Sequence, residues 1–74
     1  MTFNHILITG GAGFVGSNLC MRLRAAFPDV RVTAFDNLMR RGSELNLERL
    51  QAANVTFVRG DVRVPSELDA VGPF

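Results

Sequence analysis

The chain has 74 residues, a formal net charge of +1 at pH 7 and a hydrophobic content of 47%, which is ordinary for a globular protein. This length allows one small domain, and no apolar run approaches the roughly 20 residues that span a bilayer. The near-neutral charge gives no reason to expect nucleic acid or a membrane as a partner. The N-terminus also lacks the basic cluster of a signal peptide.

The rare residue types exclude further classes of function. Cys20 has no second cysteine to pair with, and we expect it to be a small buried residue of the first helix, as suits a reducing cytoplasm. His5 stands alone, so we expect an exposed or capping residue and no metal site. All eight basic residues are Arg, and the chain contains neither Lys nor Tyr.

A predicted strand over residues 3–9 runs directly into a glycine-rich turn. Its continuous apolar run, residues 6–8, is typical of a parallel strand covered on both faces. The glycines fit two overlapping patterns, Gly11-x-Gly13-x-x-Gly16 and Gly10-x-x-Gly13-x-x-Gly16. Such a turn allows positive φ and close approach of a pyrophosphate to the backbone. A P-loop is excluded because Ser17 follows Gly16 directly, where a Lys is required.

The first helix is predicted over residues 14–26, ending before Pro28 and Asp29. Arg22 and Arg24 are expected to face solvent. The apolar residues that recur at near-helical spacing are expected to form its inward stripe: Val15, Leu19, Leu23 and Ala26. The N-terminus of this helix would direct unpaired N–H groups and the positive end of its dipole toward a bound phosphate.

The second predicted strand covers residues 31–35 and delivers Asp36, twenty residues after Gly16. This is about where the acid that binds a dinucleotide's ribose is expected. A carboxylate there can accept hydrogen bonds from both ribose hydroxyls and would repel a 2′-phosphate. The sequence therefore favours NAD over NADP.

The remainder of the chain continues the alternation of helix and strand. A polar loop over residues 37–42 precedes a helix that starts at Ser43 or Asn46, ends near residue 53 and packs through Leu47 and Leu50. A third strand follows over residues 55–59. A short helix then begins near residue 65, with inward side chains at Leu68 and Val71.

This order predicts an α/β fold, the N-terminal part of a Rossmann doubly wound parallel sheet with βαβαβ connectivity and strand order 3-2-1. In the full fold, strand one pairs with a fourth strand that this sequence does not contain. We therefore expect residues 1–74 to be a truncated, partial domain that lacks the catalytic and substrate-binding parts. The competing interpretation of the glycines is an ordinary tight turn.

Three segments resemble the extended short-chain dehydrogenases/reductases, the NAD-dependent nucleotide-sugar epimerases and dehydratases: residues 9–19, 35–38 and 60–63. The resemblance covers nearly the whole chain but only the N-terminal part of such an enzyme. Residues 35–42, followed by Asn46-Leu47, look most like the CDP-tyvelose (CDP-paratose) 2-epimerase branch, and UDP-glucose 4-epimerases share much of this run.

The resemblance implies a role for each matching residue toward NAD. Gly10, Gly13 and Gly16 would form the phosphate loop, and the backbone N–H groups of Phe14 and Val15 would bind the pyrophosphate. The remaining roles concern the adenosine: Asp36 and Asn37 on the ribose, Arg40 near the ribose and adenine, and Asp61 with the backbone of Val62 on the adenine edge.

Two of these roles have open alternatives. Asp61 is also what a turn or a helix cap would require. Arg40 and Arg41 are equally compatible with a solvated charged loop, and a guanidinium pair also suits the 2′-phosphate of NADP.

The chemistry of the family is transient oxidation of a sugar by NAD, and it needs a Tyr base with a Lys that lowers its pKa. Without Tyr or Lys, this chain is expected to bind cofactor but not to complete the reaction. The full-length parent would be an isomerase or lyase acting on a nucleotide sugar, and a homo-oligomer is compatible with the family. Three alternatives remain: a dehydratase or 4-epimerase segment, a non-catalytic dinucleotide-binding module, and a fragment that binds nothing.

Overall fold

The computed structural model describes residues 4–39 and 42–74. The elements follow in the order β1 (His5–Thr9), α1 (Phe14–Ala26), β2 (Arg31–Asp36), η1 (Ser43–Asn46), α2 (Leu47–Ala52), β3 (Thr56–Arg59) and α3 (Pro65–Asp69). The η1 segment is a 3₁₀ turn that leads directly into α2. The two predicted starting points of the second helix both mark boundaries in the structure. Ser43 is the first residue of the 3₁₀ turn, and Asn46 is the residue directly before α2.

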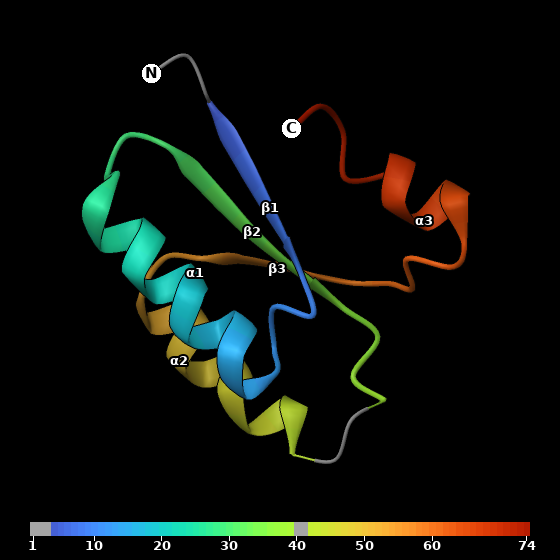
Figure 1. Cartoon of the computed structure of the whole chain (residues 1–74), viewed down its shortest axis with the longest axis horizontal. Coiled ribbons are helices and arrows are strands. Elements are labelled where there is room, and N and C mark those ends of the chain that lie inside the picture. The colour runs from blue at the N-terminus through green and yellow to red at the C-terminus, as the bar shows by residue number, and fades with distance from the viewer. Residues whose placement is uncertain (1–3, 40–41) are drawn as a thin grey trace.

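The strands form a parallel sheet in the order β1-β2-β3, which confirms the predicted order 3-2-1. β2 is central and pairs with β1 from His5↔Arg31 to Thr9↔Phe35, and with β3 from Thr33↔Thr56 to Asp36↔Arg59. Because the strands are parallel, their carboxyl ends meet at one edge. Figure 1 shows α1 and α2 on one side of the sheet and α3 on the other.

The core lies between the sheet and the pair α1 and α2. Val32 and Ala34 of β2 point to this side and pack with Cys20 of α1 and Leu50 of α2, all at most 1% exposed. Side chains alternate along a strand, so Thr33 and Phe35 point to the opposite face, where both are also buried. By the same alternation, Asp36 lies on the helix side at the end of the strand.

The predicted inward stripe of α1 is wrong. Val15 is 75% exposed, Leu19 is 44% exposed and Ala26 is exposed, while only Leu23 of the four is half-buried. Ser17 and Cys20 are the buried residues instead.

The rotation of α1 follows from the backbone contact at its first turn. A Cβ on Gly16 would collide with the carbonyl oxygen of Gly10, so this face of the helix lies against the glycine turn. Ser17 and Cys20 are carried toward the sheet as a result. Arg24, expected in solvent, is half-buried and its guanidinium donates to Phe27 O at 2.9 Å and Pro28 O at 2.5 Å.

The lone cysteine and histidine have different outcomes. Cys20 is fully buried as predicted, and desolvation raises the pKa of its thiol to about 11. His5 is more than an exposed or capping residue. Its Nδ1 lies 2.8 Å from Pro73 O, and its Nε2 lies 2.7 Å from the Oγ1 of buried Thr33. The imidazole, whose ring also packs edge-to-face against Phe74, therefore ties residues 73–74 to β1 and β2.

Candidate functional site

The turn after β1 is built from glycines with different tasks. Gly10 adopts φ of +68°, a conformation that side chains penalise. Its N–H donates to Phe35 O at 2.8 Å, and its carbonyl accepts from the Gly13 N–H at 3.1 Å. Gly11 lies so close to Ala34 that a Cβ would be 2.5 Å from the alanine Cβ. The turn is thereby packed against β2 without side chains between them.

The N-terminus of α1 emerges from this turn facing solvent. The first helical hydrogen bond runs from the Ser17 N–H to Gly13 O, so the N–H groups before it have no partner within the helix. The first turn carries no acidic side chain, and Gly13 gives no side-chain cap. Phe14 and Val15 are 79% and 75% exposed. A negatively charged group can thus approach the positive end of the helix dipole.

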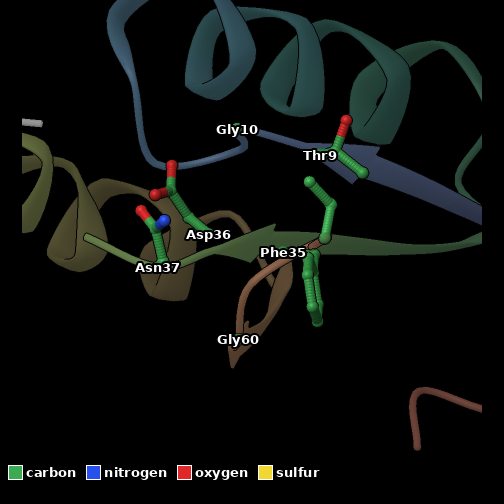
Figure 2. A pocket seen from close by; sticks show the side chains of 7 residues that line it. Thr9, Gly10, Phe35, Asp36, Asn37 and Gly60 are labelled. Atoms are coloured by element: carbon green, nitrogen blue, oxygen red, sulfur yellow. The ribbon is translucent and has the colours of Figure 1, made fainter. Parts of the chain in front are cut away.

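Asp36 is held at the end of β2 by two backbone donors. Its Oδ2 accepts from the Ala12 N–H at 3.0 Å, and its Oδ1 accepts from the Leu38 N–H at 2.8 Å. Leu38 reaches back through a left-handed conformation, with φ of 59°. Asp36 as a whole is only 8% exposed. Figure 2 shows Asp36 and Asn37 pointing toward the loop that follows Gly10.

Asn46 secures the same loop from the other side. Its Nδ2 donates to Ala12 O at 2.6 Å, so Ala12, which is fully buried, is held through both its N–H and its carbonyl. The sequence predicts Asn46 as a helix cap and gives no sign of this contact with Ala12. Asn46 lies before α2 as expected, but its side chain makes no cap hydrogen bond.

Two hollows meet at this edge of the sheet. One, of about 280 Å³, is lined by Thr9, Gly10, Phe35, Asp36, Asn37, Gly60 and Val62 (Figure 2). A larger groove, of about 550 Å³, is lined by Thr9, Gly10, Gly13, Phe14, Val15, Gly16, Gly42, Ser43, Leu45 and Asn46. Among the described residues, all the predicted site residues except Asp61 therefore gather around two adjoining hollows that share Thr9 and Gly10.

Gly60 and Phe35 shape the floor of the smaller hollow. A Cβ on Gly60 would lie 2.6 Å from the ring of Phe35, so the chain after β3 passes directly against that ring. In the sequence, this place is marked by Gly60 itself, which precedes Asp61 at the carboxyl end of the third predicted strand.

Asp61 lies beside the smaller hollow, in a third one that is also lined by Asn37, Gly60 and Glu67. Its Oδ2 accepts from the Arg63 guanidinium at 2.6 Å and from Asn37 Nδ2 at 3.4 Å, while its Oδ1 accepts from the Arg63 N–H at 2.8 Å. These hydrogen bonds from Arg63 hold the pKa of Asp61 well below its usual range. The residue thus shapes a turn, as in the alternative interpretation, and its role toward adenine stays a prediction. Arg40 lies outside the described residues.

Residues 4–39 and 42–74 contain no cluster of three or more His, Cys, Asp or Glu side chains that could hold a metal ion. Within the same ranges no helix has the length and apolar character needed to cross a membrane.

The sheet, its crossovers and its glycine turn define a Rossmann-type α/β unit. Comparison with known families gives the particular group. A profile described as "NAD dependent epimerase/dehydratase family" matches residues 6–73, and the chain belongs to this family.

Individual relatives are similar to the chain over most of its length. CDP-paratose 2-epimerase from Salmonella typhi is 46% identical over 59 residues, covering 78% of this chain and 17% of that protein. dTDP-glucose 4,6-dehydratase from Streptomyces niveus is 44% identical over 63 residues, covering 78% and 19%. The crystal structure of ADP-L-glycero-D-manno-heptose-6-epimerase from Helicobacter pylori superposes with a TM-score of 0.74 at 32% identity, covering 93% of this chain and 22% of that one. The chain thus spans less than a quarter of each of these relatives.

Proposed function

We propose that residues 1–74 are the NAD-binding segment of a nucleotide-sugar epimerase similar to the CDP-tyvelose (CDP-paratose) 2-epimerases. One observation carries the proposal. The carboxylate of Asp36 and the glycine turn lie at the same edge of the sheet, joined by the hydrogen bond from the Ala12 N–H to Asp36 Oδ2. An acid and an exposed helix N-terminus placed side by side suit the ribose and the pyrophosphate of one dinucleotide.

The residues of the chain fit NAD on structural grounds. Gly13 and Gly16 leave the backbone of the turn bare, and a Cβ on either would approach Gly10 O. The N–H groups of Phe14 and Val15 would bind the pyrophosphate, while Asp36 and Asn37 would bind the adenosine ribose. NAD, when bound, supplies a hydride acceptor for the sugar. The protein residues described here bind and orient it.

The charge of Asp36 supports NAD over NADP. Asp36 is a nearly buried residue at the end of β2, where the ribose would bind. A 2′-phosphate would bring a second negative charge close to it, and the two charges would repel each other. Asp61 and the backbone of Val62 complete the proposed site at the adenine end.

The chemical step would need residues that this sequence does not contain. Neither Tyr nor Lys is present, so the pair that serves as base in this family cannot come from residues 1–74. We propose that the base, the nucleotide-sugar pocket and any contacts between subunits belong to other parts of a longer protein.

A dehydratase segment is the second candidate, because dTDP-glucose 4,6-dehydratase is 44% identical over 63 residues. Both activities begin with oxidation of the sugar by NAD, so a cofactor segment alone serves either. Sequence from the part of the protein that binds the sugar would distinguish them.

Isothermal titration calorimetry of the chain with NAD and NADP tests the proposal. We expect NAD to bind about tenfold more tightly, which corresponds to about 1.4 kcal/mol. Equal or tighter binding of NADP would overturn the assignment of Asp36 as the residue that sets the preference. Binding of neither by the folded chain would overturn the proposed function.

A further inference from the structure

One buried polar atom at the site has no partner. The Oγ of Ser43, a residue that is only 2% exposed, makes no hydrogen bond to any described residue. Buried hydroxyls are normally paired, and an unpaired one in a native protein calls for an explanation.

The position of Ser43 suggests what its hydroxyl is for. Ser43 lines the groove that contains Gly13 and the first residues of α1. It also lines another hollow, of about 240 Å³, together with Asp36 and Asn37. Ser43 therefore stands where the proposed pyrophosphate site meets the proposed ribose site.

We propose that the Ser43 hydroxyl donates a hydrogen bond to the phosphate nearest the adenosine ribose of the bound dinucleotide; this inference rests on the proposed function. In a dinucleotide this phosphate joins the ribose, placed at Asp36, to the rest of the pyrophosphate, placed at the N-terminus of α1. Phosphate oxygens only accept hydrogen bonds at neutral pH, and the hydroxyl is a donor without a partner.

The composition of the groove makes such a donor valuable. The described residues that line it are all uncharged, so the phosphates would be bound there by backbone N–H groups and neutral side chains. The amide of Asn46, another donor in the groove, is already bonded to Ala12 O. Ser43 thus offers a side-chain donor that is both free and buried at this point.

The test compares Ser43→Ala with the parent chain in titrations against NAD, AMP and adenosine. We expect Ser43→Ala to weaken NAD and AMP by about tenfold, as for the loss of a hydrogen bond to a charged group, and to leave adenosine unchanged. Ser43→Cys carries a thiol of similar size that is a weaker donor, so its affinities for NAD and AMP should lie between those of the parent chain and those of Ser43→Ala. Ser66→Ala, at an exposed serine of α3, is the matched control and should bind like the parent chain.

Folding and binding are separated by measuring unfolding without ligand. Ser43→Ala removes an unpaired hydroxyl, so its stability should equal or exceed that of the parent chain, which a purely structural role would not allow. Unchanged NAD and AMP affinities in Ser43→Ala would overturn the inference and leave the proposed function intact. If Ser43→Ala lost as much affinity for adenosine as for NAD and AMP, the hydroxyl would bind the ribose and the assignment to the phosphate would be overturned. If the parent chain bound none of the three, the proposed function and this inference would fail together.

Discussion

The carboxylate of Asp36 accepts a hydrogen bond from the backbone N–H of Ala12, with 3.0 Å between Oδ2 and N. This contact joins the end of β2 to the turn that follows β1, across 24 residues of sequence. The residue proposed to bind ribose therefore also fixes the turn proposed to bind phosphate. A substitution that disturbs one part of the site should therefore also disturb the other part.

Asp36→Asn tests this double role. Asn offers one acceptor oxygen to the N–H groups of Ala12 and Leu38, so one of them would face an amide donor. We expect the free energy of unfolding to fall by about 1–3 kcal/mol. The preference for NAD over NADP should shrink because the negative charge is lost. Denaturant unfolding and calorimetric titration measure the two effects.

Asp29→Asn is the matched control for charge. Asp29 is exposed at the turn between α1 and β2, so this variant should keep the stability and the cofactor preference of the parent chain. Equal effects of the two substitutions would show that net charge, and not the position of Asp36, is responsible.

Gly16→Ala tests the contact that sets the rotation of α1. The added Cβ would collide with the backbone oxygen of Gly10, which cannot move as a flexible side chain does. We expect a loss of about 1–3 kcal/mol in the free energy of unfolding. Urea unfolding followed by circular dichroism measures this loss.

Gly13→Ala is the comparison for Gly16→Ala. Its Cβ would lie 3.3 Å from Gly10 O, a tight contact without collision. We expect a smaller loss of stability than in Gly16→Ala, with a reduced affinity for NAD because the methyl group stands at the proposed pyrophosphate site. Equal stability losses would argue against the backbone contact at Gly16 as the determinant of packing.

Burial of Cys20 predicts a pH dependence of stability. The thiol ionises near 9.0 in the unfolded chain but near 11 in the folded one. As pH rises, the thiol therefore ionises in the unfolded state before it ionises in the folded state. Ionisation lowers the free energy of the unfolded state, so the free energy of unfolding falls as pH rises from 9 toward 11. Between pH 8 and pH 10 the free energy of unfolding should fall by roughly 1 kcal/mol on this account.

Cys20→Ala provides the reference for that measurement. The variant will be less stable at every pH because it leaves a cavity, but its stability should lack the fall caused by the thiol. Parallel pH profiles for the two proteins between pH 8 and pH 10 would contradict burial of the thiol.

The hydrogen bond between His5 Nε2 and Thr33 Oγ1 can be measured by a double-mutant cycle. His5→Ala leaves the fully buried Thr33 hydroxyl without this partner, whereas Thr33→Val removes the hydroxyl and keeps the shape. We expect a coupling free energy of about 1 kcal/mol in denaturant unfolding. Additive effects of the two substitutions would mean that the contact does not stabilise the fold.

The sequence was sufficient to predict the order of the elements, the strand order and the position of Asp36. These features depend on local signals. A glycine turn after an apolar strand and an acid after the next strand meet whenever both strands are parallel, because their carboxyl ends share an edge. In the structure, the last pair between β1 and β2 is Thr9↔Phe35, and Asp36 lies one residue beyond it.

The rotation of α1 could not be predicted from its apolar pattern. Hydrophobic periodicity selects the stripe with Val15 and Leu19, but the bare backbone of Gly16 turns Ser17 and Cys20 toward the sheet. The role of Asn46 was hidden for a similar reason. Its partner, the carbonyl of Ala12, is 34 residues away and carries no side-chain signal.

The proposed NAD site is tested most directly by an NMR titration of the chain with NAD and, separately, NADP. We expect NAD to shift the amide signals of residues 10–16, Asp36 and Asn37, and Asp61 and Val62, and NADP to shift the same signals more weakly. Stronger shifts with NADP would contradict the role of Asp36. A dispersed spectrum in which neither cofactor moves these signals would contradict the proposed site as a whole.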